Sequence, residues 1–178
     1  MTSEDIVLRS FRDDEFDLLF DRLRGWKPEA VAADEGYWRT LTQKRVSESG
    51  DWAEDGIDFA VEFEGRLAGA VQAVGRYYRL PPNVYELGIE FFDERDRGRG
   101  LGSRVLETFI PRVFANEAIR LQGRTHVENT PMIRLFDRLG FVREGVLRDI
   151  WPLEGLCGDM VLYAMTRPDY ERAFRAGA

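Results

Sequence analysis

The sequence has little of the side-chain chemistry on which disulfide scaffolds and metal sites depend. Among its 178 residues it contains one cysteine, Cys157, and one histidine, His126. A single cysteine excludes an internal disulfide, and no cluster of His, Cys, Asp or Glu has metal-ligand spacing, so we predict neither a disulfide nor a metal. Because no histidine or second cysteine lies near Cys157 in the sequence to activate its thiol, we expect that thiol to be inert.

Long hydrophobic runs are also missing. The polar, acidic start Met1–Asp5 has no apolar stretch behind it, which predicts neither a signal peptide nor a membrane span and favours a cytoplasmic location. There is no internal repeat and no low-complexity segment, and 44% of the residues are hydrophobic. This length and composition are typical of one globular domain, here residues 1–178.

Positive charge is in the minority. Lys and Arg total 25 against 32 Asp and Glu, a net charge of −7, which argues against nucleic acid or a membrane surface as a partner. The positive charge nevertheless gathers locally at Arg95, Arg97, Arg99 and Arg104. This contrast suits a polyanionic cofactor and a cationic amine, although solubility alone would explain the acidic surface equally well.

A strand, a glycine-rich turn and a helix follow one another between Tyr85 and Phe114. Residues 85–92 alternate as in a strand with one buried face, and apolar residues recur at helical spacing from Leu101. Between them, glycines at 98, 100 and 102 remove the Cβ atoms that would keep a ligand from backbone N–H groups at a helix N-terminus. The pattern predicts a site for phosphate or pyrophosphate, although a solvated helix start without a ligand stays open.

The common nucleotide-binding motifs fit this turn poorly. Its glycines are spaced G-x-G-x-G in the middle of the chain, whereas a dinucleotide fold has G-x-G-x-x-G near the start of a βαβ unit. A nucleoside-triphosphate loop needs a lysine before its Ser or Thr, and here Gly102 directly precedes Ser103. A nucleotide-binding protein is therefore only a third interpretation.

Four ordered blocks of the sequence resemble the GNAT family of N-acetyltransferases. The run Arg97–Gly102 contains R-x-x-G-x-G, which is similar to the signature with which that family holds the pyrophosphate of acetyl-CoA. Asn129–Phe141 resembles its second block, an asparagine, a short helix and then Leu-Gly-Phe. Arg143–Arg148 and Asp159–Met165 resemble the last two strands of the branch that contains ribosomal-protein N-terminal and polyamine acetylases.

The resemblance implies a fold and a cofactor. The fold is α/β (α+β), with a mixed, mostly antiparallel central sheet flanked by helices and a parallel strand pair that splays apart to bind CoA. Acetyl-CoA is the implied cosubstrate, with its pantetheine arm near the backbone of Phe91 and Phe92 and in contact with Asn129, for which helix capping is an equally good alternative. The residues implied to hold the pyrophosphate are Arg97, Gly98, Arg99, Gly100, Leu101, Gly102 and Ser103.

Transfer to an amine needs a base, because an alkylamine at neutral pH is almost wholly protonated and cannot attack. Glu86 occupies the strand position at which histone acetylases of the family carry their glutamate base, and Glu90 lies four residues further on the same strand face. Both acids would be merely solvated if that face pointed to water. His126 is a third candidate, as proton donor, base or acceptor contact, or simply as a structural hydrogen-bonding residue.

Two positions depart from the family's pattern. Many members have a tyrosine where this chain has Phe136, and the ribosomal acetylases often have a serine where it has Met132. Neither side chain can protonate a departing thiolate. We therefore predict an acetyl-CoA-dependent N-acetyltransferase that works by direct transfer in a ternary complex, and keep a catalytically degenerate CoA-binding or regulatory module as the alternative.

The acceptor is predicted only as a class, an amine-bearing small molecule or a protein N-terminus, and a monomer and a homodimer both stay open. In the family the first helices and their loop flank the acceptor, so Trp26, Tyr37 and Trp38 are candidates to contact it, although single aromatic residues are more often core. Residues 1–56 would form this acceptor side, 57–165 the sheet and CoA-binding core, and 166–178 a tail with little to fix it.

The remaining patterns predict the order of the elements. Strands are expected over 5–9, 57–63, 67–77, 120–126, 142–147 and 159–165, and helices over about 13–25, 37–47, 101–114 and 130–139. We expect Asp13 to cap the first helix, Gly25 and Gly140 to end helices, and Pro111 to kink its helix or end it early. The strand over 120–126 should run parallel to the Tyr85 strand, because a helix separates them.

Overall fold

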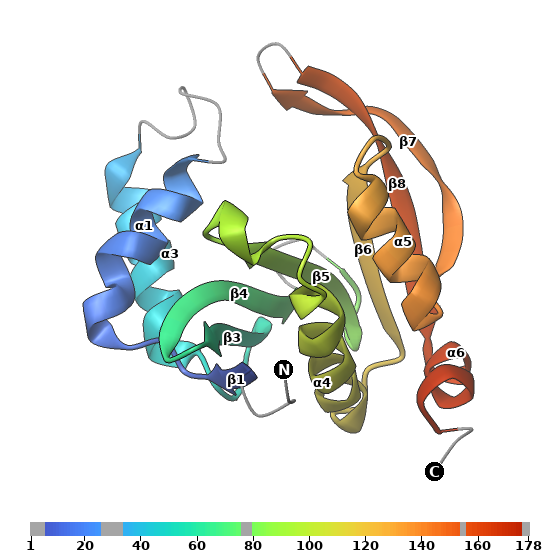
Figure 1. Ribbon diagram of the computed structural model, residues 1–178, viewed down its shortest axis with the longest axis horizontal. Coiled ribbons are helices and arrows are strands. Elements are labelled where there is room, and N and C mark those ends of the chain that lie inside the picture. The colour runs from blue at the N-terminus through green and yellow to red at the C-terminus, as the bar shows by residue number, and fades with distance from the viewer. Residues whose placement is uncertain (1–5, 26–33, 76–79, 154–155, 176–178) are drawn as a thin grey trace.

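The computed structural model describes residues 6–25, 34–75, 80–153 and 156–175 (Figure 1). Within these residues an eight-stranded mixed sheet is ordered β1-β3-β4-β5-β6-β8-β7, with β2 paired to β3 beside this path. Its strands are β1 (Ile6–Arg9), β2 (Trp52–Ala53), β3 (Gly56–Phe63), β4 (Arg66–Val74), β5 (Val84–Phe91), β6 (Arg120–His126), β7 (Val142–Leu153) and β8 (Leu156–Thr166). Among the described pairs, β5 with β6 is parallel and the others are antiparallel. The predicted fold class and the parallel strand are confirmed.

Helices pack on both faces of this sheet. They are η2 (Asp13–Glu15), α1 (Phe16–Gly25), α3 (Glu35–Glu48), η4 (Glu94–Asp96), α4 (Leu101–Ala115), α5 (Thr130–Leu139), α6 (Arg167–Tyr170) and the π-helical turn η5 (Glu171–Arg175). In Figure 1, α1 and α3 lie side by side at one end of the sheet, and α5 lies against β6 and β8 at the other. Within the described residues no helix is long and apolar enough to cross a membrane.

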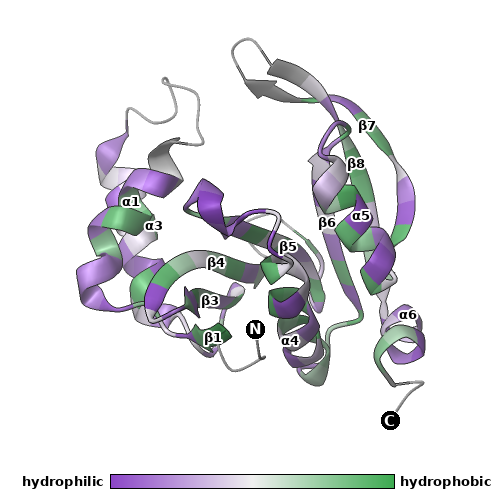
Figure 2. Ribbon diagram, in the orientation of Figure 1, coloured by the Kyte–Doolittle hydropathy of each residue, from purple (hydrophilic) through white to green (hydrophobic). Residues whose placement is uncertain are grey.

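The strands send alternate side chains to two different clusters. Phe59 and Leu87 belong to the main core, where the ring of Phe59 meets that of Phe109 from α4 edge-on, with centroids 6.2 Å apart. Ala60, the next residue of β3, belongs to a second cluster together with Leu19 of α1. Figure 2 shows hydrophobic residues concentrated on the central strands and along α4. The α4 and α5 side is therefore one face, and the α1 and α3 side is the other.

One prediction about a helix end is wrong, and one of the two alternatives expected at Pro111 is not found. Asp13 does not cap the first helix; it is the first residue of η2, and the N–H of Arg12 donates to Glu15 Oε2 at 2.9 Å. α4 does not end early at Pro111 but continues to Ala115. Because Ile110 and Val113, which lie before and after the proline in α4, are each 0% exposed in the core, packing outweighs the one backbone hydrogen bond that proline removes.

The C-terminal segment is not a loose tail. Residues 167–175 are helical, and Tyr170 is 6% exposed. Its ring stacks on Phe114 of α4 with centroids 4.5 Å apart. A buried aromatic contact of this kind fixes a terminus that polar composition alone suggested would be free.

Other boundaries agree more closely. α1 is described as far as Gly25, and Gly140 ends α5 with a φ of 84°. β7 and β8 extend beyond the predicted 142–147 and 159–165 because they continue to pair with each other past a register shift between Leu147 and Trp151. The expectation about Cys157 concerns a side chain outside those described.

Candidate active site

The glycine-rich turn before α4 is exposed between two buried residues. Asp96 and Leu101 are each 1% exposed, whereas residues 97–100 between them are exposed. Gly98 and Gly100 have φ values of 71° and 76°, a region that residues with a Cβ rarely adopt. A Cβ added to either glycine would meet no atom within 4 Å. The turn thus presents its backbone to open space.

α4 begins at this turn with Gly100 as its N-cap residue, which offers no side chain to bond the first N–H groups. These N–H groups have no partner within the helix and carry the positive end of its dipole. The guanidinium of Arg138, from α5, donates to the hydroxyl of Ser103 in the first turn of α4. Arg138 thus places a second positive group beside the positive end of the α4 dipole, and the two together favour an anion at this position.

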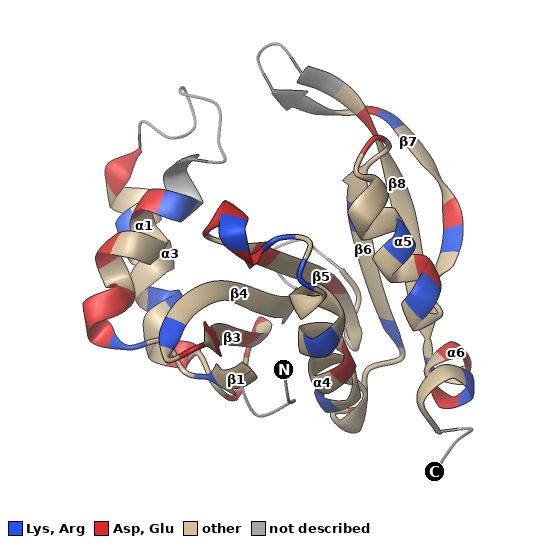
Figure 3. Ribbon diagram, viewed as in Figure 1, with Lys and Arg blue, Asp and Glu red and all other residues tan. Residues whose placement is uncertain are grey.

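The arginines of the turn differ in what already binds them. Arg97 is 58% exposed and lies 3.6 Å from Glu94 Oε1. Arg99 lies between two carboxylates, with Glu64 Oε1 at 3.1 Å and Asp96 Oδ1 at 3.7 Å. Figure 3 shows positive and negative segments close together along the chain just before α4. Arg97 is therefore better placed than Arg99 to meet a ligand from solvent.

β5 and β6 are paired at one end and separate at the other. Their described register covers Val84–Glu86 against Arg120–Gln122, although both strands continue beyond it. β5 meanwhile stays paired with β4 as far as Phe91. The splay that the resemblance implied therefore begins after Glu86 and leads along β5 toward the glycine turn.

The backbone of Phe91 faces this splay, whereas that of Phe92 does not. The N–H of Phe92 donates to the carbonyl of Ala68 in β4 at 2.9 Å. Since both polar backbone groups of a residue in an antiparallel strand point the same way, Ile89 and Phe91 direct theirs away from β4, toward β6. Sequence reasoning named Phe91 and Phe92 together and missed Ile89, because which residues face which neighbour depends on the register.

The ring of Phe136 lies close to the point at which β5 and β6 separate. A Cβ added to Gly123 of β6 would meet that ring at 2.8 Å and Leu87 Cβ of β5 at 3.7 Å. Phe136 is 1% exposed and stacks on Tyr163 with centroids 5.0 Å apart. The Tyr163 hydroxyl donates to Asp137 Oδ1 at 3.0 Å. Residue 136 is thus a packed core position without a proton donor. Met132, the other position that departs from the family's pattern, is half-buried.

Glu86 is buried and hydrogen-bonded on both oxygens. It is 5% exposed, and its Oε1 accepts from Arg124 Nε at 2.7 Å while its Oε2 accepts from Gln122 Nε2 at 2.9 Å. Both partners come from β6, which pairs with β5 at this point. The alternative that Glu86 is a solvated surface acid is therefore wrong. Neither partner was among the candidates taken from the sequence.

Glu90 lies on the same face of β5, but its surroundings differ. Among the described residues, no hydrogen bond reaches its carboxyl group. Burial raises the pKa of this carboxyl above its ordinary value, an effect that the charge of Arg45 opposes and that of Asp58 reinforces. Arg45, from α3, donates to Asp58 through Nη2 at 3.0 Å. Glu90 is therefore the less strongly bound of the two acids.

His126 ends β6 on the face that also carries Gln122 and Arg124. Its Nδ1 accepts from the N–H of Glu128 at 3.3 Å, so the neutral ring carries its hydrogen on Nε2. The ring of His126 lies beside Gly158 of β8. A residue with a side chain would not fit there, because its Cβ would collide with Nε2. His126 is 38% exposed and can reach a ligand from solvent.

Asn129 caps α5. Its Oδ1 accepts from the N–H of Met132 at 3.3 Å, and its Nδ2 donates to Thr125 Oγ1 at 2.9 Å. Both ends of the amide are therefore used within the protein. The capping alternative is confirmed, while contact with a cofactor stays a prediction.

The aromatic residues predicted to contact the acceptor are not equivalent. Trp38 is 1% exposed in α3 and belongs to the core, as single aromatic residues usually do. Tyr37 is 46% exposed, and its ring meets that of Trp38 edge-on at 5.0 Å. Trp26 lies outside the described residues. Of the two that are described, only Tyr37 can touch a ligand.

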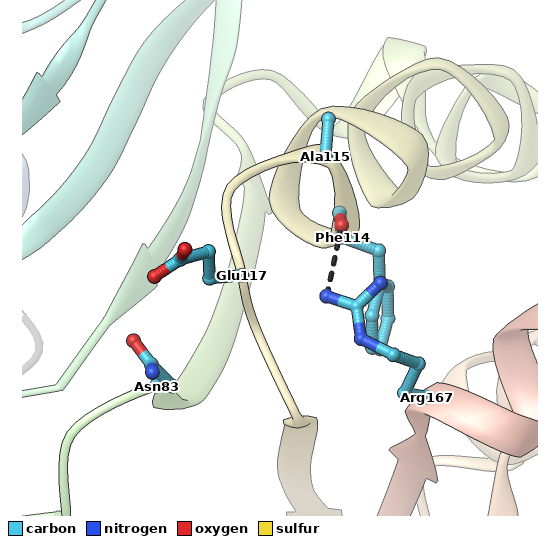
Figure 4. A pocket seen from close by; sticks show the side chains of 5 residues that line it. All are labelled: Asn83, Phe114, Ala115, Glu117 and Arg167. Atoms are coloured by element: carbon cyan, nitrogen blue, oxygen red, sulfur yellow. Dashed lines mark hydrogen bonds between the residues drawn. The ribbon is translucent and has the colours of Figure 1, made fainter.

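A cavity of about 510 Å³ lies at the other end of α4 (Figure 4). Its lining residues are Asn83, Phe114, Ala115, Glu117 and Arg167. Arg167 Nη2 donates to the carbonyls of Phe114 at 3.1 Å and Ala118 at 2.7 Å, which satisfies groups that a helix end leaves unpaired. This arginine therefore has a structural role. In the described part of the chain, no three His, Cys, Asp or Glu residues are grouped as metal ligands.

Comparisons with known proteins agree with this geometry. A family model described as an acetyltransferase (GNAT) domain matches residues 5–142. The SPbeta prophage-derived uncharacterized N-acetyltransferase YokL of Bacillus subtilis (strain 168) is 24% identical over 181 residues, which cover 96% of this chain and 94% of that protein.

Solved structures share the fold at lower identity. A chimera of the spermidine N-acetyltransferase SpeG from Vibrio cholerae has a TM-score of 0.72 and 18% identity over 94% of this chain and 99% of its own. The ribosomal alpha-N-protein acetyltransferase RimL, in complex with coenzyme A, has a TM-score of 0.69 and 15% identity over 91% of this chain and 94% of its own. With the family model spanning most of its length, the chain belongs to the GNAT acetyltransferase family and is an acetyl-CoA-dependent acyltransferase.

Proposed function

We propose that this acyltransferase transfers the acetyl group of acetyl-CoA to a primary amine, by direct attack within a ternary complex. The observation that carries the proposal is the course of β5, which leads from Glu86, where the splay begins, past Glu90 to the exposed glycine turn. One strand would thus align the thioester, the base and the phosphate site. Relatives named for spermidine and for a ribosomal protein support an amine as acceptor, either a small molecule or a protein N-terminus.

The cofactor would bind through backbone groups. Its pyrophosphate would accept hydrogen bonds from N–H groups of residues 98–103, where the dipole of α4 favours negative charge, since the N–H of Arg97 already donates to the carbonyl of Glu94. Its pantetheine arm would pair with Ile89 and Phe91, whose backbone groups face the splay. Phe92 would support this strand from the α1 and α3 side, where it is 7% exposed.

Glu90 is the proposed base. A base must take a proton from an ammonium near neutral pH, so a carboxyl with a raised pKa is well suited to the role. The pKa of Glu90 is raised by burial, whereas Glu86 accepts from Arg124 and Gln122. Glu86 is the second candidate, and in either case the pair of acids would attract a cationic amine.

His126 is proposed as a donor to the acceptor or to the departing thiolate. Its Nε2 carries the hydrogen in the neutral ring, and it lies on the face of β6 that holds the partners of Glu86. The core position of Phe136 leaves the chain without the tyrosine that many family members use. His126→Ala should therefore reduce turnover more than it changes the KM for acetyl-CoA.

The test is thiol release from acetyl-CoA with a panel of monoamines, peptide N-termini, polyamines and aminoglycosides. With the best acceptor, the pH dependence of kcat/KM is measured for the wild type, Glu90→Gln and Glu86→Gln. Glu107→Gln, an exposed glutamate on α4, serves as the control. We expect Glu90→Gln to lower kcat/KM by about 100-fold or more and to remove its decline at low pH.

Three results would contradict parts of this proposal. Acetyl-CoA binding without thiol release above hydrolysis for any amine would indicate a degenerate CoA-binding module. An unchanged pH profile in Glu90→Gln together with a changed one in Glu86→Gln would make Glu86 the base. A loss of activity in Glu107→Gln as large as in Glu90→Gln would mean that charge in general, and not one base, matters.

A further inference from the structure

Asp96 is a buried carboxylate that the proposed chemistry does not use. Its side chain is 0% exposed, and it is the last residue of η4, directly before the exposed turn. Arg66, the first residue of β4, donates to it through two parallel bonds, Nη1 to Oδ2 at 2.8 Å and Nη2 to Oδ1 at 2.6 Å. This fork lowers the pKa of Asp96 below its ordinary value.

An ion pair whose carboxylate is fully buried is a costly way to fill space, because the carboxylate loses hydration that a hydrophobic side chain would not need. Its particular property is geometry, since a bidentate arginine fixes the orientation of the carboxylate as well as its position. The Arg66–Asp96 fork therefore fixes the direction in which the chain enters the turn at residue 97.

The other end of the turn is fixed to the β3–β4 hairpin, to which Arg66 also belongs. Leu101, the first residue of α4, packs in a cluster with Phe63 at the end of β3 and Ala68 in β4. The four exposed residues 97–100 therefore bridge two buried anchors, Asp96 and Leu101, that both rest on the β3–β4 hairpin. A short segment held at both ends loses less conformational freedom when a ligand orders it.

Arg99 ties the middle of the turn to this hairpin as well. Its guanidinium lies over the ring of Phe63, 4.9 Å from the centroid. It also forms ion pairs with Glu64, in the hairpin turn, and with Asp96. The Arg99 side chain therefore points back to the protein, and the space beside Gly98 and Gly100 stays open, since an added Cβ at either glycine would meet no atom within 4 Å.

We propose that the Arg66–Asp96 fork is a positioning pair for the cofactor, which holds the turn at 97–100 in its binding conformation before acetyl-CoA arrives. Loss of the fork would weaken the affinity for acetyl-CoA and leave the chemical step at saturating cofactor unchanged. This inference rests on the proposed placement of the pyrophosphate on that turn. Arg99 would contribute through the same anchor, and Arg97 would be the arginine that meets the phosphate.

The experiment compares Asp96→Asn with a matched control. Glu15→Gln removes a similar fork, in which Arg9 donates to Glu15 at 2.9 and 2.6 Å and the Glu15 side chain is 11% exposed. Calorimetric Kd for acetyl-CoA, kcat at saturating acetyl-CoA and Tm are measured for both variants and the wild type. Arg66→Lys, which keeps the charge but not the fork, is a milder second variant.

We expect Asp96→Asn to raise the Kd by at least about tenfold, which is about 1.4 kcal/mol of binding free energy. The kcat at saturating acetyl-CoA should stay within about twofold, which is less than 1 kcal/mol. Glu15→Gln should lower Tm without changing the Kd. Arg66→Lys should raise the Kd by an intermediate factor, and it decides the question if Asp96→Asn does not fold.

Equal Kd values in wild type, Asp96→Asn and Arg66→Lys would overturn the inference and leave Asp96 a purely structural residue. A fall in kcat with an unchanged Kd would overturn it too. If the wild type binds acetyl-CoA and Gly100→Val binds it equally well, the placement on the turn is wrong, and the positioning role falls with it. The Gly100 result thus separates failure of the placement from failure of the positioning pair.

Discussion

The two faces of the sheet are formed by the same strands, but they carry different kinds of side chain. On the α4 and α5 face, the residues of the main core are hydrophobic, and several, such as Phe109 and Leu121, are 0% exposed. On the α1 and α3 face, the smaller apolar cluster shares its strands with the acids Asp58, Glu86 and Glu90. Adjacent residues of one strand can therefore serve stability and chemistry separately.

This difference suggests where substitutions should act. An apolar side chain contributes through the water it excludes and the space it fills. A buried acid costs free energy unless it is paired, and it is retained where its charge is used. Changes on the first face should lower stability with little effect on chemistry, whereas changes of the acids on the second face should affect chemistry more and stability less.

The largest effect on stability is expected on the α4 face. Phe109→Ala should destabilise the protein by about 3–5 kcal/mol, because it removes a fully buried ring that meets Phe59 edge-on. Urea unfolding followed by circular dichroism measures the change. A loss below about 1 kcal/mol would mean that this face is loosely packed and would weaken the comparison.

An intermediate loss is expected for Glu86→Gln. Arg124 Nε would no longer donate to a charged carboxylate, and hydrogen bonds with a charged partner contribute about 1–3 kcal/mol each. The same urea experiment applies, with Glu107→Gln as the exposed control. A stability equal to that of the wild type would show that the Glu86 pair serves no structural purpose.

Glu90→Gln is expected to change stability in the opposite direction. A carboxyl whose pKa is raised in the folded state costs stability as pH rises through that value, so at pH 7 the native Glu90 is unfavourable. Replacing it with an uncharged amide should raise Tm by a few degrees at pH 7 and by less at pH 4. A lower Tm at pH 7 would contradict the assignment of Glu90 as a half-buried acid kept for function.

The smallest effect is expected from acid titration of the paired carboxylates. Hydrogen bonding by Arg9 lowers the pKa of Glu62, so its contribution to stability is present above the unfolded value and is lost as pH falls through the folded one. Tm measured from about pH 5 to pH 3 should therefore fall less steeply in Arg9→Gln than in the wild type. If Tm falls equally steeply with pH in Arg9→Gln and in the wild type, other carboxylates control acid unfolding.

The sequence was most informative where the signal is local. The glycine turn, the α4 helix after it and the parallel strand at 120–126 follow from spacing within a few tens of residues. The sequence was least informative about partners that only the register brings together. Arg124 reaches Glu86 across 38 positions, and Arg138 reaches Ser103 across 35.

Two errors have the same physical origin. Pro111 and the segment after residue 167 were judged by local propensity, but both are set by packing against the core. Phe91 and Phe92 could not be told apart, because only the pairing of β5 with β4 decides which backbone groups stay open. Tertiary contacts override local preference at these positions.

The most direct test of the account is calorimetric titration of acetyl-CoA into the wild type, Gly100→Val and Gly145→Val. An added Cβ would meet no atom within 4 Å at either glycine, but Gly145 lies in β7, away from the turn. The account predicts binding by the wild type and by Gly145→Val, and at least about tenfold weaker binding by Gly100→Val. Binding of equal strength by folded Gly100→Val, or no heat with the folded wild type, would contradict it.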